Sequence, residues 1–157
     1  MAKQTIIVTG ASRGLGAAVA RIAAQMEANV VLTARSEPDL EAVAQEIEDS
    51  GGRALAVAGD LSQAADCQRI VTEAVQTFGQ VDALVNNAAI VTPIAPIATA
   101  DPESWWDNLA VNVRGPFMLT QAALPGLRKN KGRVVNVSTG AAVVPVHSWS
   151  AYSVAKA

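Results

Sequence analysis

The sequence predicts an α/β fold in which a parallel, doubly wound sheet is covered by helices on both faces. Short apolar runs alternate with helix-length segments, the pattern of successive right-handed strand–helix–strand units. Half of the 157 residues are hydrophobic but only 4% are aromatic, so we expect a core of Ala, Val, Ile and Leu. A glycine-rich turn joins the first apolar run to the first helical segment, as in sheets of this class that hold a ligand.

Five strands are expected to alternate with four helices. The predicted strands are Gln4–Thr9, Asn29–Thr33, Arg53–Ala58, Ala83–Asn86 and Arg133–Val137. The predicted helices are Gly14–Glu27, Pro38–Ser50, Gln63–Phe78 and Pro102–Lys129, and a further helix has barely begun where the sequence stops at Ala157. The fifth strand is mostly Val, so it is expected to be buried on both faces, or to form an exposed edge if no strand follows it.

Residues typical of helix starts and bends support these boundaries. Ser36, Ser62 and Asp101 stand where helices are expected to start, because their side chains accept hydrogen bonds from free N–H groups. The long last helix is expected to bend at Gly115-Pro116 or near Pro125, since proline removes a helical N–H donor.

Composition and charge exclude several classes of protein. The net charge is −2 and no run of Lys or Arg occurs, so nucleic acid and anionic membrane are not expected partners. The single cysteine, Cys67, excludes an internal disulfide, and no metal site is expected. The first strand begins near the N-terminus, and no apolar stretch reaches the ~18 residues of a membrane span. We therefore expect one domain, residues 1–157, of a soluble cytoplasmic protein without a signal peptide.

The turn Thr9-Gly10-Ala11-Ser12-Arg13-Gly14-Leu15-Gly16 is the principal candidate for a dinucleotide site. Gly10 allows the chain to leave the strand sharply, Gly14 allows a pyrophosphate to approach the backbone, and Gly16 allows close packing of the helix. The free N–H groups and dipole of the first helical turn favour the anion. The spacing G-x-x-x-G-x-G is weak evidence alone, and an ordinary flexible turn is the alternative interpretation.

The end of the second strand indicates which dinucleotide is bound. An NAD site would place Asp or Glu there, about twenty residues past the glycines, to accept from the ribose 2′-hydroxyl. This sequence has Arg35 instead, and both Arg35 and Arg13 can donate hydrogen bonds to a 2′-phosphate. Two solvated surface arginines are the alternative, and Glu37 slightly weakens the case. NADP(H) is nevertheless the expected cofactor, in preference to NAD(H).

Polar residues also follow the third and fourth strands. Asp60 lies at a strand's carboxyl end, where ligands of open sheets bind, and can accept from an adenine amino group or cap the next helix. Asn86-Asn87-Ala88-Ala89 follows the fourth strand. The two asparagines either pin the neighbouring strands beside the cofactor or form a plain turn.

The chemistry is expected from three residues near the C-terminus. Ser138 ends the fifth strand, while Tyr152 and Lys156 are spaced i, i+4 and therefore share one helical face. A free phenol ionises only near pH 10, but a neighbouring ammonium or an oxidised nicotinamide favours the phenolate. Ser138 can polarise a substrate oxygen. Tyr-x-x-x-Lys alone is common on surface helices, so its weight comes from the strand-terminal Ser and the dinucleotide turn.

Together these residues resemble the short-chain dehydrogenase/reductase family, and the resemblance extends along the whole chain. It rests on the glycine turn, Asn86-Asn87-Ala88-Ala89, Asn112, Ser138, Tyr152 and Lys156. The glycine spacing is similar to that of short-form members, and the implied fold is a Rossmann-like sheet. The segment from Gly140 to Ala151 is similar to the branch that contains sepiapterin- and benzil-reductase-like enzymes.

The resemblance implies a role for each matching residue. Tyr152 is expected to be the acid–base and Ser138 to orient the substrate. Lys156 is expected to bind the nicotinamide ribose and favour the tyrosinate, and Asn112 to hold a proton-relay water. Arg35 matches the NADP-preferring pattern of the family. The implied cofactor-binding residues are Gly10, Ser12, Arg13, Gly14, Leu15, Gly16, Arg35, Asp60, Leu61, Asn87, Ala88, Tyr152 and Lys156.

Two features depart from the family pattern. Ala89 stands where members carry Gly, a change expected to cost little if its φ is negative. The sequence also stops at Ala157, before the further strands and the substrate lid that members possess. We therefore expect an N-terminal portion of a longer single-domain enzyme, and expect residues 1–157 alone to be poorly soluble or partly disordered and inactive.

The remaining conspicuous side chains receive simpler interpretations. His147 is either a structural loop residue or part of a substrate pocket. Trp105 and Trp106 are expected to pack against the sheet or a neighbouring subunit, while Trp149 is a better pocket candidate.

The sequence thus predicts an NADPH-dependent oxidoreductase that reduces a ketone or aldehyde, or runs in reverse, with Tyr152 delivering the proton. A homo-oligomer, dimer or tetramer, is expected for the full-length form. The alternative is a non-catalytic NADP-binding or sensor protein, or a truncated fragment, that retains the fold.

Overall fold

A five-stranded parallel sheet forms the centre of the computed structural model, which describes residues 3–157. Its strands are β1(Thr5–Thr9), β2(Asn29–Ala34), β3(Arg53–Ala58), β4(Ala83–Asn86) and β5(Arg133–Asn136). The order across the sheet is β3-β2-β1-β4-β5, and every pairing is parallel. The chain therefore winds outward from β1 to β3 and then returns to β4 on the other side. This confirms the doubly wound α/β fold.

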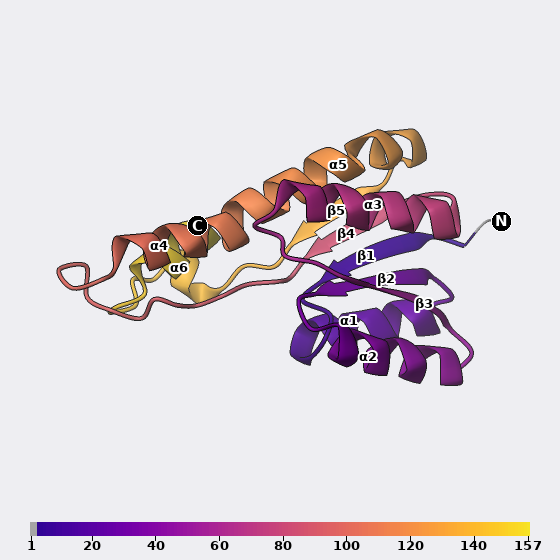
Figure 1. Cartoon of the computed structure of the whole chain (residues 1–157), viewed down its shortest axis with the longest axis horizontal. Coiled ribbons are helices and arrows are strands. Elements are labelled where there is room, and N and C mark those ends of the chain that lie inside the picture. Colours follow the sequence, from indigo (N-terminus) through magenta and orange to yellow (C-terminus); the bar gives the residue numbers. More distant parts are fainter. Residues whose placement is uncertain (1–2) are drawn as a thin grey trace.

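Helices cover both faces of the sheet (Figure 1). One face carries α1(Gly14–Gln25) and α2(Glu37–Asp49), and the other carries α3(Ala64–Phe78) and α5(Gly115–Asn130). Two shorter helices, α4(Pro102–Leu109) and α6(Ser150–Lys156), extend beyond the carboxyl ends of the strands, and the 3₁₀ turn η2(Gly140–Ala142) precedes α6. Most loops that bear candidate site residues therefore meet at one edge of the sheet.

The core consists of two apolar layers, one on each side of the sheet. Consecutive strand residues point to opposite faces, so Val31 joins the layer under α3 and α5 while Leu32 joins the layer under α1 and α2. Both side chains are fully buried. Small alanines allow α1 to lie close to the strands, which explains why a core with few aromatic residues is sufficient.

The predicted helix starts have three different outcomes. Asp101 caps α4, because its carboxylate accepts from the main-chain N–H of Ser104 at 2.8 Å. Ser36 occupies the N-cap position of α2, but its hydroxyl makes no capping hydrogen bond. Ser62 lies one residue before the N-cap of α3, which is Gln63, so that prediction was displaced by one residue.

The predicted single helix Pro102–Lys129 is wrong in its middle. It is divided into α4, the π-helical segment η1(Ala110–Arg114) and α5. Pro116 accounts for the wider turn, because it has no N–H to donate to the carbonyl of Asn112 four residues earlier. The predicted disturbance at Gly115-Pro116 is therefore present, whereas Pro125 lies within α5.

The strand β5 lies at the edge of the sheet in the described part of the chain. Val134 and Val135 are 38% and 50% exposed. The prediction that this strand is buried on both faces is therefore wrong here, while the alternative of an exposed edge is confirmed. The reason is that only β4 pairs with it.

Candidate active site

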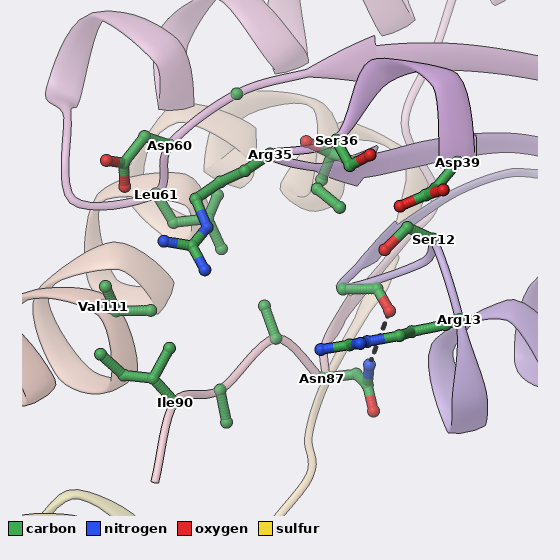
Figure 2. A pocket seen from close by; sticks show the side chains of 16 residues that line it. Ser12, Arg13, Arg35, Ser36, Asp39, Asp60, Leu61, Asn87, Ile90 and Val111 are labelled. Carbon is green, nitrogen blue, oxygen red and sulfur yellow. Dashed lines mark hydrogen bonds between the residues drawn. The ribbon is translucent and has the colours of Figure 1, made fainter. Parts of the chain in front are cut away.

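A cavity of about 440 Å³ opens at the carboxyl ends of β1 to β4, beside the segment η1. Loops after all four strands contribute to its wall (Figure 2). Predicted cofactor-binding residues line much of it: Gly10, Ser12, Arg13, Arg35, Asp60, Leu61, Asn87 and Ala88. Gly14, Leu15 and Gly16 do not line it. The sheet thus brings predicted residues as far apart in sequence as Gly10 and Ala88 to one cavity.

The glycine turn is compact because side chains would not fit at two of its positions. A Cβ on Gly10, whose φ is +64°, would lie 2.9 Å from the Cα of Ala88. A Cβ on Gly16 would overlap the carbonyl oxygen of Gly10 and lie 2.6 Å from Nδ2 of Asn87. By contrast, a Cβ on Gly14 would meet nothing within 4 Å, so the space above it is open for a ligand. The close approaches agree with the packing roles predicted for Gly10 and Gly16, and the pyrophosphate role of Gly14 remains a prediction.

The two adjacent asparagines connect β4 to both of its neighbours. Asn87 Nδ2 donates to the carbonyl of Thr9 at 2.9 Å, and Asn86 Nδ2 donates to Oδ1 of Asn136 at 2.8 Å. Thr9 Oγ1 accepts from the main-chain N–H groups of Asn87 and Ala88, each at 2.9 Å. The pinning role therefore holds in the structure, and the plain-turn alternative does not. The φ of Ala89 is not positive, so an alanine fits there without backbone strain.

Two arginines are available at the cavity. Neither Arg13 nor Arg35 forms an ion pair or a side-chain hydrogen bond with any described residue. Figure 2 shows Arg35 extending into the cavity on the side of Asp60 and Leu61, and Arg13 on the side of Asn87. Asp39 also lines the cavity, an acidic neighbour that the sequence argument overlooked.

Asp60 orders the loop that follows β3. Its Oδ1 accepts from the main-chain N–H of Ser62 at 2.9 Å, and its own N–H donates to Oδ2 of Asp66 at 2.8 Å. Asp60 therefore stabilises the loop rather than capping α3, whose N-cap residue is Gln63, and its carboxylate lines the cavity. Binding of an adenine amino group remains a prediction.

Asn112 holds the loop after β4 with its side chain. Its Oδ1 accepts from the N–H of Ile90 at 2.9 Å, and its Nδ2 donates to the carbonyl of Ile90 at 2.7 Å and to Oδ1 of Asn108 at 2.8 Å. Asn108 in turn donates to the carbonyls of Ile90 and Thr92. The amide of Asn112 is therefore fully engaged, so a relay water would have to use its main-chain carbonyl, which has Pro116 in place of the usual helical donor.

The three predicted chemical residues lie together but outside the main cavity. Ser138 Oγ donates to the carbonyl of Lys156 at 2.7 Å, and Lys156 Nζ donates to the carbonyl of Val137 at 2.8 Å. Lys156 Nζ also lies 6.0 Å from the ring centroid of Tyr152. Burial lowers the pKa of Lys156 from its ordinary value, since desolvation disfavours the ammonium. The predicted shared face of Tyr152 and Lys156 is present.

Similarity to known proteins identifies the family. The family model for short chain dehydrogenases matches residues 4–157. The chain belongs to the short chain dehydrogenase family. It is 39% identical to a short chain dehydrogenase of Pseudocercospora fijiensis and 37% identical to an uncharacterized oxidoreductase of Thermotoga maritima, each over 98% of this chain. These alignments cover 50% and 61% of the two relatives, so the chain spans only part of their length.

Solved structures agree with this assignment. A metagenomic short-chain oxidoreductase in complex with NADP superimposes with a TM-score of 0.93 at 39% identity, over 99% of this chain and 71% of that one. A Serratia marcescens short-chain dehydrogenase/reductase gives a TM-score of 0.93 at 34% identity, over 99% and 63%. Within residues 3–157, no helix of this family member is long and apolar enough to span a membrane.

Two contacts of this short chain dehydrogenase were not predicted from the sequence, one made by Trp105 and one by Asn108. Trp105 Nε1 donates to Oγ of Ser150, the first residue of α6, at 3.1 Å. Asn108 was also missed, although two asparagines four residues apart in a predicted helix were an available signal. Trp149 packs edge-on against Tyr152 with ring centroids 5.6 Å apart, whereas His147 is exposed.

Proposed function

We propose that this family member is an NADPH-dependent oxidoreductase that reduces a ketone or aldehyde to an alcohol, or catalyses the reverse reaction. The observation that carries this proposal is one cavity lined by two unpaired arginines, Arg13 and Arg35, and by the glycine turn through Gly10 and Ser12. The grouping of Ser138, Tyr152 and Lys156 supports the chemical part. The NADP complex of a similar structure supports the choice of cofactor.

The residues present fit NADPH. The open space over Gly14 and the first turn of α1 suit the pyrophosphate, since free N–H groups favour an anion. Arg13 and Arg35 suit the 2′-phosphate, and Asp60 with Leu61 suits the adenine. Tyr152 and Lys156 suit the nicotinamide ribose. When bound, the cofactor supplies the hydride.

The protein's own groups then handle the proton. Tyr152 donates its phenolic proton to the substrate carbonyl oxygen, and Ser138 orients that oxygen through its hydroxyl. Lys156 shares a helical face with Tyr152, and its Nζ lies 6.0 Å from the ring centroid of Tyr152. Its contact with the carbonyl of Val137 fixes the side chain at the end of β5. A water on the main-chain carbonyl of Asn112 completes the proton path.

A non-catalytic NADP-binding or sensor protein is the second candidate. One observation favours it: Ser138 Oγ and Lys156 Nζ are both engaged by main-chain carbonyls rather than free. A sensor needs the cavity but has no need of a proton donor at Tyr152. Turnover measurements separate the two candidates.

The test is NADPH oxidation by the full-length form of the protein, followed by absorbance, with a panel of ketones and aldehydes. Tyr152→Phe should abolish turnover and leave the NADPH dissociation constant within about twofold, because only proton transfer is lost. Val154→Ala, on an exposed position of the same helix, is the matched control and should retain activity. More than trace turnover by Tyr152→Phe contradicts the assigned acid, and NADPH binding without any turnover favours the sensor.

A further inference from the structure

The loop after β3 forms one wall of the cavity through Gly59, Asp60 and Leu61. We call residues 58–62, the last residue of β3 and the four that follow it, the β3 loop. Asp60 supplies part of its pairing, because its side chain accepts from the N–H of Ser62 and its carbonyl accepts from the N–H of Gln63, each at 2.9 Å. The carbonyls of Ala58 and Ser62 are bound by side chains from outside the loop. The wall's position is therefore set by whatever holds these groups.

Side chains of α3 hold the first part of the β3 loop. Arg69 Nη2 donates to the carbonyl of Ala58, and Asp66 Oδ2 accepts from the N–H of Asp60 at 2.8 Å. Arg69 also pairs with Asp66 at 3.0 Å. The hydrogen bond from Asp60 and then the Arg69 guanidinium lower the pKa of Asp66. These contacts are local, since α3 follows the loop directly.

The last residue of the β3 loop is held from a distant segment. Arg114 Nη2 donates to the carbonyl of Ser62 at 2.8 Å, across 52 positions of sequence. Arg114 ends the segment η1, which also contributes Val111 to the cavity wall. Leu61 and Val111 lie next to each other on one side of the cavity (Figure 2), and this guanidinium ties their two segments together.

Backbone packing makes this connection short. A Cβ on Gly115, the residue after Arg114, would lie 2.9 Å from both the Cβ and the carbonyl oxygen of Leu61. The start of α5 thus lies directly against the β3 loop. A displacement at Ser62 would be transmitted to Leu61, whose side chain lines the cavity.

We propose that Arg114 is a positioning residue that sets the β3 loop against η1 and so shapes the adenosine end of the cofactor site. This inference rests on the proposed function. Arg114 itself does not line the cavity, so it acts through Ser62 and Leu61 rather than by touching the ligand. A charge-assisted hydrogen bond to a main-chain carbonyl is strong enough to fix a loop, although exposure to solvent weakens it.

The test compares Arg114→Gln with Arg114→Lys, which retains a charged donor. Arg128→Gln is the matched control, because Arg128 is an exposed arginine of α5 without an ion pair among the described residues. Dissociation constants are measured for NADPH and for adenosine 2′,5′-bisphosphate, which carries the adenosine end alone. Arg114→Gln should raise both constants about 5- to 10-fold, and Arg114→Lys should remain within about twofold of the unmodified protein. In turnover assays over a range of NADPH concentrations, Arg114→Gln should raise KM for NADPH and leave kcat within about twofold.

Each contrary result has a definite meaning. If the unmodified protein binds NADPH and Arg114→Gln binds both ligands equally well, the positioning role is overturned while the proposed function stands. A loss of kcat with unchanged KM, an equal effect of Arg128→Gln, or an unfolded Arg114→Gln variant also overturns it. Failure of the unmodified protein to bind NADPH overturns the proposed function and this inference together.

Discussion

Replacing Asn112 with alanine should destabilise the protein substantially, because its buried amide joins η1 to the loop after β4. Three hydrogen bonds are lost: two with the main chain of Ile90 and one with Asn108. The carbonyl of Ile90 keeps a partner, since Asn108 Nδ2 donates to it at 3.0 Å. The N–H of Ile90 and Oδ1 of Asn108 each lose their hydrogen bond to Asn112.

The size of the expected loss in the free energy of unfolding follows from these two polar groups, which are left without a partner. A buried polar group without a partner costs about 1–3 kcal/mol. Asn108 is fully buried, so its oxygen should incur a large part of that cost, whereas Ile90 is half-buried and water can reach its N–H. Alanine returns about 0.5 kcal/mol through its better helix propensity. The expected loss in the free energy of unfolding is about 2–4 kcal/mol.

Urea unfolding followed by circular dichroism measures this loss. Gln121→Ala is the matched control, because Gln121 is an exposed residue of α5 without a side-chain hydrogen bond to any described residue. It abandons no buried partner and should change the free energy of unfolding by at most about 0.5 kcal/mol. Equal losses for the two variants, or a loss below about 1 kcal/mol for Asn112→Ala, would refute the reasoning.

Three further predictions concern cofactor choice, helix position and acid stability. Arg35→Asp should weaken NADPH binding about tenfold or more and relatively improve NADH, measured by fluorescence titration. Equal affinities of the unmodified protein for both cofactors would contradict the assignment. Trp105→Phe removes the donor to Ser150 and should lower kcat severalfold with unchanged NADPH affinity, because α6 carries Tyr152. An unchanged kcat would exclude this positioning role. Because the pKa of Asp66 is below its ordinary value of 3.8, its stabilisation is complete above that pH and lost as pH falls below it. Asp66→Asn should flatten that fall in urea unfolding measured from pH 5 to 3, and parallel curves would show that another group is responsible.

The sheet was predictable because its signals are local. Short apolar runs fix the strands, and the observed bounds of β3 and β4 equal the predicted ones. The helix α3 ends at Gly79, whose φ is +82°. A glycine that ends a helix can be recognised without knowledge of distant contacts. The family was equally readable, since its motif residues either follow strand ends or, like Tyr152 and Lys156, are one helical turn apart.

The candidate site was predictable as a set of residues but not as a set of contacts. Arg13, Arg35 and Asp60 could be placed near one another because parallel strands end at the same edge of a sheet. Nothing in the sequence indicated that Asp39 would share that wall. Helical spacing predicted that Tyr152 and Lys156 share one face, but it could not predict that Lys156 Nζ donates to the carbonyl of Val137.

Sequence alone therefore determined the strands and the glycine turn and indicated the candidate chemical residues, because periodicity, glycine spacing and residue type act within a few positions. Tertiary structure alone decided that η1 widens, that Asn112 engages Ile90 and that Arg114 reaches Ser62. These contacts join segments 22 and 52 positions apart. They exist because the chain connections between strands place α4, η1 and α5 at the carboxyl edge of the sheet. Main-chain groups at this edge have no strand partners, so they form hydrogen bonds with the side chains that lie nearby.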